Sequence, residues 1–439
     1  MRIEVRTSDR ADHTHVSPGP AATEQHSRHG IKADLLIPGR GEPLEHGAVV
    51  IDQEKLAWVG PQSCIPSIYA SIPYVSVPVV MPGLWDCHVH YTGSTLSSND
   101  QLFGTNGALV GARVSRDVAN TLLAGFTSVR ELGGCGGDVS PAINDGSILG
   151  PHIYSSIAPI SMTGGHGDIH TTPLLALLDA CAHGYPIALC DGEAECIRAV
   201  RLQLRRGARV IKVAATGGVG SEMDDPQDRQ FSDKELTAMV EEAARAKRIV
   251  AAHCHGKEGI IAALKAGCKT IEHGSYLDEE AIELMKDKGA ILIATRSIQE
   301  GGLQLPEMWS PRQYEKLKVI VGQNKKAYEL AVQHGVRIAL GTDLGLSDAG
   351  TVLSHGRNGK ELWYAVQAGL TPLQAIEAST ATAPETLGPQ APRSGLLKEG
   401  YDADLIAVCA DPSRDIGLLS EAENITHVWK AGKLYKSPR

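Results

Sequence analysis

The strongest constraint on the fold is a series of eight apolar runs that alternate with amphipathic helical patterns between about residues 79 and 390. Several runs are nearly continuous in Val, Ile and Ala, as expected for strands buried on both faces of a parallel sheet. Eight strands that alternate with helices predict an α/β fold of the (β/α)8 TIM-barrel type. The runs cover residues 79–90, 127–132, 152–161, 208–216, 248–256, 270–275, 290–297 and 337–344.

The two ends of the chain lack this alternation. Residues 33–60 and 400–439 instead show short strand patterns separated by tight glycine turns. Neither end alone supplies a full sheet, so we predict that the two ends pair into one small β-sandwich domain beside the barrel. The expected division is a disordered tail at 1–30, a composite β-sandwich domain from 31–78 plus 395–439, and a barrel at 79–394.

Composition narrows the classes of function. The chain has 51 Asp and Glu against 42 Lys and Arg, a net charge of −9, which argues against a nucleic-acid-binding protein because such proteins usually present a basic face. No run of about eighteen apolar residues is present, so no membrane partner is expected. The N-terminus lacks the apolar region of a signal peptide, and the nine scattered cysteines fit reduced thiols. We therefore expect a cytoplasmic location, with secretion still open.

Polar residues at the ends of the runs are the candidates for chemistry, because the active site of such a barrel lies at the carboxyl ends of its strands. His88 and His90 are two residues apart in the first run, and the period of a strand places both on one face. One His-x-His pair, or one buried histidine, is more often structural than metal-binding. Several such residues at successive strand ends favour a metal site. The later runs end with Lys212, His253, His255, His273 and Asp343.

The donor set indicates which metals are expected. Imidazole and carboxylate ligands suit Zn²⁺ best, with Mn²⁺, Co²⁺ or Ni²⁺ as alternatives. Lys212 needs a separate explanation, because an ammonium group cannot ligate a metal and is unfavourable when buried. Reaction of its amine with CO₂ would give a carbamate, an anion able to bridge two metals. The alternative is a salt bridge between Lys212 and Glu272 or Asp343.

Four further residues are candidates for supporting roles. His166 follows the third run and can hydrogen-bond a substrate carbonyl or an oxyanion. His255 shares a face with His253, so it either contacts substrate or replaces His253 as a ligand. Arg296 ends the seventh run and can pair with a substrate carboxylate, although an ordinary salt bridge is equally expected there. Asp86 precedes His88 by two residues and is expected to orient that ligand.

Several motifs show a resemblance to the amidohydrolase superfamily, namely MPGLWDCHVH, VIKVAATGG, AHCHG, TIEHGS and LGTD. Further segments, among them LLIPGRGEPL, AINDGSILGP, TGGHGDI and THVWKAGKL, are similar to the ochratoxinase-like branch of that superfamily. The similarity runs from about residue 33 to about residue 436. Four segments that follow strand ends depart from this branch, and we expect them to line the pocket; the last resembles the Xaa-Pro dipeptidase and imidazolonepropionase-like branch. These segments are 92–107, 171–190, 299–315 and 344–358.

The resemblance implies a binuclear metal amidohydrolase with two divalent ions, Zn²⁺ being expected. Lys212, as N6-carboxylysine, would bridge the two ions together with a hydroxide that attacks the carbonyl. Asp343 would take the proton as a general base and pass it to the leaving amine as a general acid. The other ligands that the resemblance implies are His88, His90 and Asp343 for one metal, and His253 and His273 for the other.

The resemblance also implies a substrate class. It points to carboxypeptidase-like hydrolysis of the amide to a C-terminal amino acid, as in ochratoxin A giving phenylalanine and ochratoxin alpha. The alternatives are Xaa-Pro dipeptides, other N-acyl amino acids and a cyclic amide. An inactive scaffold of this family would have lost ligands, whereas here all six ligand positions are filled. A small-molecule amide is the expected partner, and the family implies a homo-oligomer, such as an octamer.

Overall fold

The computed structural model describes residues 28–95, 105–348 and 350–438. The tail expected at residues 1–30 lies outside this part of the chain except for its last three residues, and strand β1 already begins at His29. Among the described residues, no helix has the length and apolar character needed to cross a membrane.

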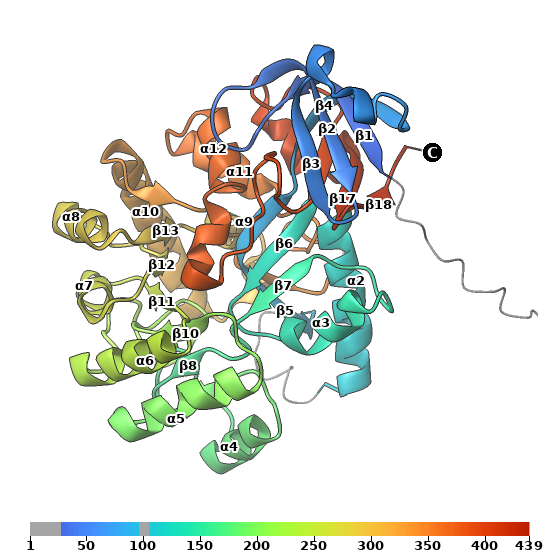
Figure 1. The fold of residues 1–439 in the computed structure, drawn as a ribbon. Helices are drawn as coiled ribbons and strands as arrows, with labels where there is room; N and C mark the ends of the chain where they lie inside the picture. Colours follow the sequence, from blue (N-terminus) through green and yellow to red (C-terminus); the bar gives the residue numbers. More distant parts are fainter. Residues whose placement is uncertain (1–27, 96–104, 349, 439) are drawn as a thin grey trace, which may run out of the picture.

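Two parallel sheets occupy the middle of the molecule (Figure 1). The first has the strand order β14-β13-β12-β11-β10-β8-β9, and the second has the order β15-β5-β6-β7. The predicted α/β class with parallel sheets is thereby confirmed. The strands are β5 (Leu84–Ser94), β6 (Phe126–Glu131), β7 (His152–Ser155), β8 (Ile160–Ser161), β9 (Ala188–Leu189), β10 (Ile211–Ala214), β11 (Val250–Cys254), β12 (Thr270–His273), β13 (Ile291–Ile293), β14 (Arg337–Ile338) and β15 (Leu344–Leu346).

Two of the predicted runs are each divided between the sheets. The run 152–161 contributes β7 to one sheet and β8 to the other, and the run 337–344 is divided between β14 and β15. The backbone of Ile157 has φ 71° and that of Asp343 has φ 60°. A positive φ is incompatible with an extended strand, so each run breaks near that residue and its expected single strand was wrong.

Backbone hydrogen bonds connect the two sheets at both borders. Arg209 N donates to Ser155 O at 2.8 Å, and Cys87 N donates to Leu340 O at 2.8 Å. These contacts bring the carboxyl ends of the strands of both sheets to one side of the molecule. A closed eight-stranded barrel stays a prediction.

Helices cover the outer side of the strands (Figure 1). Ser232 and Glu235 form the predicted capping box at the start of α6, and Thr371 caps α12 as expected. Apolar side chains of the helices, such as Leu236 and Met239, share one buried core with Ile211 of β10. The α-helices are α2 (Gly107–Leu123), α3 (Gly136–Asn144), α4 (Leu174–Ala182), α5 (Gly192–Arg205), α6 (Asp233–Arg245), α7 (Lys257–Ala266), α8 (Glu279–Lys288), α9 (Arg296–Leu303), α10 (Pro311–Gln333), α11 (Lys360–Gln367) and α12 (Pro372–Ala378); short 3-10 helices lie at Gln62–Cys64, Ser67–Tyr69, Pro306–Met308, Ala383–Gln390, Ile416–Ser420 and Ala422–Asn424.

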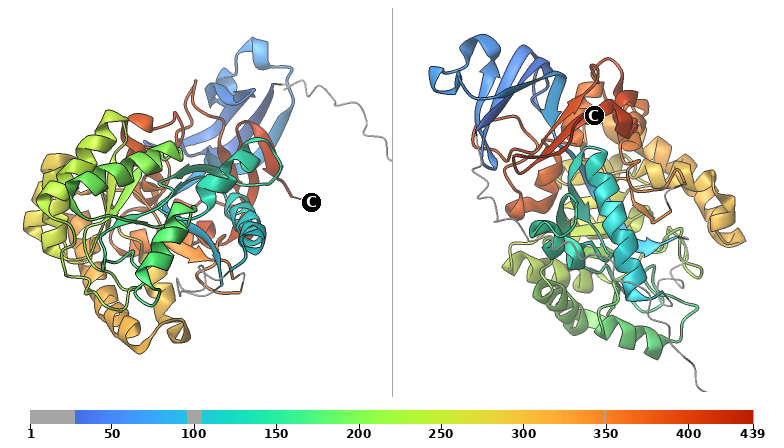
Figure 2. Two further views of the ribbon diagram at one scale, coloured as in Figure 1. Left: turned by 90° about the horizontal axis from the view of Figure 1, so that it is seen from below. Right: turned by 90° about the vertical axis from the view of Figure 1, so that its right-hand side faces the viewer.

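The two chain ends share one mixed sheet with the strand order β18-β17-β16-β4-β1-β2-β3, and Figure 2 shows its N-terminal and C-terminal strands side by side. β4 pairs antiparallel with β16, with Val80 opposite Ala407. The expected pairing of the two ends is therefore observed, whereas the sandwich form stays a prediction. Residue 78, the expected domain boundary, falls inside β4. The strands are β1 (His29–Leu36), β2 (Leu44–Asp52), β3 (Lys55–Pro61), β4 (Tyr74–Pro82), β16 (Leu405–Val408), β17 (Ile425–Lys430) and β18 (Lys433–Lys436).

Candidate metal centre

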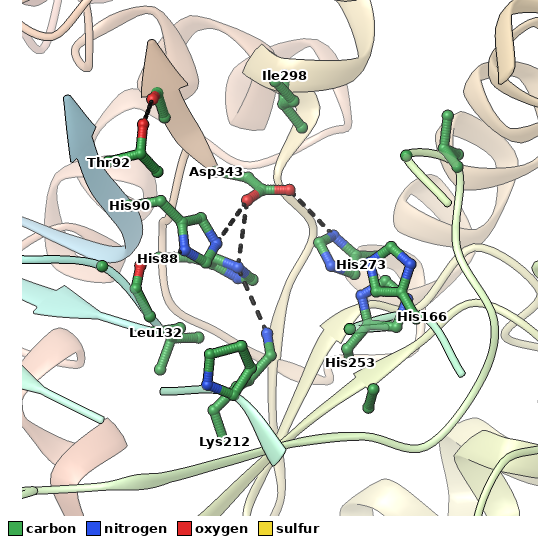
Figure 3. A pocket seen from close by; sticks show the side chains of 18 of the residues that line it. His88, His90, Thr92, Leu132, His166, Lys212, His253, His273, Ile298 and Asp343 are labelled. Carbon is green, nitrogen blue, oxygen red and sulfur yellow. Dashed lines mark hydrogen bonds and ion pairs between the residues drawn. The ribbon is translucent and has the colours of Figure 1, made fainter. Parts of the chain in front are cut away.

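A cavity of about 300 Å³ lies at the carboxyl ends of the parallel strands (Figure 3). Eight of the nine residues predicted as metal ligands or substrate contacts line it, although they come from strands of both sheets and the loops that follow them. The cavity therefore brings together groups that are up to 255 residues apart, from His88 to Asp343. The eight residues are His88, His90, His166, Lys212, His253, His255, His273 and Asp343.

His88 is oriented by a buried pair of charges. Its Nδ1 lies 2.8 Å from Glu272 Oε2, and Glu272 Oε1 accepts a hydrogen bond from Arg130 Nη2 at 2.7 Å. Burial opposes ionisation of Glu272, but Arg130 and His88 hold the pKa of Glu272 well below its usual range. An ionised carboxylate only accepts hydrogen bonds, so His88 carries its proton on Nδ1. The lone pair of Nε2 then faces the cavity, as in a metal-binding histidine.

His90 has the same tautomer for a similar reason. Its Nδ1 donates to Gly133 O at 2.7 Å, and Nε2 lies 3.0 Å from Asp343 Oδ1. His88 Nε2 is 3.4 Å from the same oxygen. Two imidazole lone pairs therefore meet a carboxylate oxygen, and only a proton or a cation between them makes that arrangement favourable. The residues present fit a divalent metal at this point.

The position of the Asp343 side chain is fixed by an unusual backbone conformation and a backbone hydrogen bond. Asp343 has φ 60°, and its N–H donates to His88 O at 2.6 Å. A non-glycine residue in this region is strained, and such strain is often found at functional sites. Burial disfavours the ionised carboxylate, but His88 and His90 lower the pKa of Asp343 to about 2. The side chain is therefore an anion at neutral pH.

The other half of the cluster is held by neutral groups. His273 Nδ1 donates to Thr295 Oγ1 at 2.7 Å, since this hydroxyl gives its own proton to Ala294 O. His255 Nδ1 lies 2.8 Å from Ser275 Oγ. The ring of His253 contacts both histidines, with centroids 4.8 Å from His255 and 4.6 Å from His273.

Two overlapping groups of residues are close enough to hold a metal. Within each group the ligand atoms lie within 4.8 Å of one another. His273 belongs to both groups, so the two potential sites adjoin. The presence of His255 beside His253 leaves both of them as candidates for the same ligand position. The groups are His253, His255 and His273, and His88, His273 and Asp343.

Lys212 extends from β10 into the same cavity. Its Nζ lies 3.4 Å from His88 Nε2, and only 4% of the residue is exposed. Burial lowers the pKa of this amine to about 8. Neither Glu272 nor Asp343, the two expected salt-bridge partners, is ion-paired with Lys212. The structure therefore does not provide the salt bridge that was the alternative explanation for a buried lysine here.

His166 is half-buried and its ring stacks on His253, with centroids 4.2 Å apart. Its Nδ1 lies 2.9 Å from Ser221 Oγ, and its backbone N–H donates to Gln230 Oε1 at 3.0 Å. Burial lowers the pKa of the imidazole. A Cβ on Gly218 would lie 2.2 Å from His166 Cε1, so only glycine allows this ring to pack where it does.

Arg296 is the one residue predicted as a metal ligand or a substrate contact that does not line the cavity. It is the first residue of α9, and its guanidinium donates to Val321 O at 2.9 Å and Asn324 Oδ1 at 3.0 Å and pairs with Glu300. β13 ends at Ile293, and the positive φ of Thr295 turns the chain into the helix. The expected contact of Arg296 with a substrate carboxylate is not supported, because this turn directs its side chain between helices.

Asp86 was expected to orient a ligand and lies in a position to do so. Its carboxylate accepts hydrogen bonds from the backbone N–H of His88 at 3.1 Å and from Thr342 Oγ1 at 2.6 Å. It thereby joins the strand of His88 to the segment of Asp343. Arg130, by contrast, was missed, although a charged residue within an apolar run is a sequence signal. The hydroxyls of Thr295 and Ser275 had no such signal.

The remaining lining of the cavity is mainly apolar. Each of the four divergent segments contributes to it, as expected, although residues 96–104 of the first lie outside the described residues. Among the described residues that line the cavity, no arginine is present, and Lys212 is the one lysine. The contributions are Thr92 and Ser94, then Tyr185, Pro186 and Ile187, then Gln299, Met308 and Trp309, and finally Gly345, Leu346 and Leu353.

The fold of this chain has a close counterpart among known proteins. Residues 79–435 match the amidohydrolase family, and the chain belongs to that family. It is a hydrolase, and the family is typically metal-dependent, which agrees with the cluster of histidines.

One relative has particularly high similarity. The chain is 48% identical to the ochratoxinase of Aspergillus niger, over 95% of this chain and 88% of that protein. The crystal structure of that ochratoxinase superposes with a TM-score of 0.87, covering 94% of this chain and 96% of the other. A Xaa-Pro dipeptidase with bound methionine is 30% identical, with a TM-score of 0.82 over 94% of this chain and 100% of the other.

Proposed function

We propose that this protein hydrolyses the amide bond to a C-terminal amino acid, with ochratoxin A as the substrate and phenylalanine and ochratoxin alpha as the products. The observation that carries the proposal is the convergence of imidazole lone pairs, one carboxylate and one buried lysine at the end of an apolar cavity. The 48% identity to a fungal ochratoxinase supports this substrate over others. The apolar walls suit an aromatic acyl group and an aromatic amino acid.

Two divalent ions, with zinc expected, would complete the site. His88, His90 and Asp343 would hold one ion, and His253 and His273 the other, with Lys212 as N6-carboxylysine between them. When bound, the ions polarise the scissile carbonyl and make water acidic enough to act as hydroxide near neutral pH. We further propose that residues 79–394 form a (β/α)8 barrel and that 31–78 with 395–439 form a β-sandwich. A homo-oligomer and a cytoplasmic location stay predictions.

The chain's own residues account for proton transfer and orientation. Asp343 is ionised and lies beside His88 and His90, so it takes the proton of the attacking water and returns it to the leaving amine. Glu272 holds the imidazole ring of His88, and the hydroxyl of Thr295 holds that of His273. Fixed rings keep the lone pairs aimed at one point, which reduces the reorganisation needed during reaction.

Hydrolysis of Xaa-Pro dipeptides is the alternative function. The observation in its favour is the 30% identity to a Xaa-Pro dipeptidase, which extends over 94% of this chain. The segments that line the cavity differ from the ochratoxinase-like pattern, so the substrate is less constrained than the chemistry.

Release of phenylalanine from ochratoxin A by the zinc-reconstituted protein tests the proposal, with Asp343→Asn as the control. Rapid release that is lost in the variant supports both the chemistry and the substrate class. Absence of release, with zinc bound, would reject ochratoxin A and direct the assay to Xaa-Pro dipeptides and other N-acyl amino acids.

A further inference from the structure

A chain of hydrogen bonds decides which nitrogen of His166 carries the proton. Its Nδ1 lies 2.9 Å from Ser221 Oγ, and that hydroxyl donates to the carboxylate of Asp224. A hydroxyl has one proton to give, so Ser221 Oγ can only accept from Nδ1–H of His166. The other acceptor within reach of this hydroxyl is Gly218 O at 3.4 Å, which leads to the same tautomer. Neutral His166 therefore has an unprotonated Nε2.

Buried groups hold this chain of hydrogen bonds in one direction. Gln230 Nε2 donates to Asp224 Oδ2 at 3.0 Å, while Gln230 Oε1 accepts from the backbone of His166. Lys316 Nζ donates to Ser221 O at 2.5 Å and lies 3.5 Å from Asp224 Oδ1. The cation and the amide both require Asp224 to be an acceptor, which keeps Ser221 as its donor.

The free nitrogen of His166 lies on the substrate side. The Nδ1 edge faces Ser221, which does not line the cavity, whereas His166 itself does. The ring stacks on His253, one of the proposed metal ligands. Nε2 is thus the acceptor on the cavity side of a ring that packs against the histidine cluster. His166 was expected to donate a hydrogen bond to a substrate carbonyl or an oxyanion. That role needs a proton on Nε2, and this network places the proton on Nδ1 instead.

We propose that His166 Nε2 accepts a hydrogen bond from the N–H of the scissile amide and thereby selects secondary amides over tertiary ones. N-acyl amino acids such as ochratoxin A carry that N–H, whereas a Xaa-Pro bond does not. A tertiary amide would leave a half-buried lone pair without a partner, which disfavours its binding and reaction. Ser221, Asp224 and Lys316 are positioning residues in this scheme. The inference rests on the proposed amide-hydrolase function.

The test compares two substrates that differ only at the amide nitrogen. N-benzoyl-phenylalanine and N-benzoyl-N-methylphenylalanine are hydrolysed by zinc-loaded protein, and the ratio of their kcat/KM values is measured. We expect the kcat/KM of the secondary amide divided by that of the N-methylated amide to be about 10- to 100-fold larger in the wild type than in His166→Asn. Asparagine can retain the bond to Ser221 but has no group at the position of Nε2. His166→Gln places an amide there and should retain part of the preference.

The positioning residues have a matched control. Lys316→Ala and Ser221→Ala should both lower the ratio, whereas Lys318→Ala should not, because Lys318 is an exposed residue of the same helix that pairs with Glu315. A loss of folding would lower both rates together and leave the ratio unchanged. Zinc content measured on each variant checks that the metal centre is intact.

Two results would overturn the proposal in distinguishable ways. If the ratio is unchanged in His166→Asn and Ser221→Ala and the secondary amide is still hydrolysed, the role of His166 is rejected but the proposed function is not. Failure of the zinc-loaded wild type to hydrolyse either amide or ochratoxin A would reject the proposed function and this inference with it.

Discussion

The two halves of the histidine cluster use different means to hold imidazole rings. On one side, His88 is supported by Glu272 and, behind it, Arg130, a pair of charges without exposed surface. On the other side, His273 is supported by the neutral hydroxyl of Thr295. A buried ion pair loses about 3–5 kcal/mol when one partner is removed, whereas a neutral hydrogen bond contributes about 1 kcal/mol.

This difference separates two kinds of sensitivity. Loss of a charge behind His88 leaves an uncompensated carboxylate in the core, so it affects folding as well as ligand geometry. Loss of a hydroxyl behind His273 mainly frees a ring to rotate. We therefore expect the two proposed metal sites to respond differently when their supports are removed.

Asp343→Asn should have the largest effect, because Asp343 contacts both halves, with Oδ1 3.4 Å from His88 Nε2 and Oδ2 4.0 Å from His273 Nδ1. An amide cannot carry the proton, so kcat should fall by about 10²- to 10⁴-fold, with a smaller change in KM. Steady-state kinetics on the zinc-loaded variant measure both constants. Near wild-type turnover would remove Asp343 from the mechanism.

Lys212→Ala should come next, because the proposed carbamate is the one ligand common to both ions. The variant should lose bound metal and activity, and short carboxylic acids should restore part of the activity by occupying the vacated space. Metal analysis of the purified variant gives the stoichiometry. Full metal occupancy without Lys212 would contradict the bridging role.

Arg130→Met should test the charged half directly. Removal of the guanidinium leaves Glu272 buried without its partner, so the variant should be destabilised by about 3–5 kcal/mol. The double variant Arg130→Met with Glu272→Gln should recover part of this loss, because the carboxylate is then also neutral. Chemical denaturation of the metal-free proteins measures these differences. Equal stability of Arg130→Met and the wild type would show that the Arg130–Glu272 ion pair does not stabilise the part of the site around His88.

Thr295→Val should have the smallest effect on stability, about 1–2 kcal/mol, because valine retains the shape and removes only the two neutral hydrogen bonds of this hydroxyl, to His273 and to Ala294 O. Metal affinity should decrease by about tenfold, as is typical when a partner behind a metal ligand is lost. Competition with a chelator measures that affinity. A loss of stability as large as that of Arg130→Met would contradict the expected difference between the charged support of His88 and the neutral support of His273.

Much of the fold followed from the spacing of apolar residues. All eight runs contain strands of the two parallel sheets, and the capping signal at Ser232 was confirmed. The divided runs could not be predicted, because Ile157 is a β-branched residue that rarely adopts a positive φ, and Asp343 tolerates one but stands within an apolar run without any other turn signal. The chain adopts these angles only because neighbouring strands hold it there, as His88 O does through the backbone N–H of Asp343.

The candidate site was also predictable only in part. The two-residue period of a strand sufficed to place His88 and His90 on one face, and both line the cavity. Arg296 also appeared to end a strand, but its surroundings are helices, and no local pattern distinguished it from a residue in the pocket. Arg130 was detectable in principle as a charge within an apolar run, whereas Thr295 looks like any other threonine of a strand end.

By itself the sequence determined the order of the strands and helices and which polar residues stand at the strand ends, because the periods of strands and helices are local properties of the backbone. Only the tertiary structure decided which nitrogen of each imidazole is free. That choice depends on the group hydrogen-bonded to the other nitrogen, such as Glu272 behind His88 or Ser221 behind His166, which lie 184 and 55 residues away along the chain. Hydrogen bonds act over about 3 Å, so the proton positions of this site exist only once distant segments have met.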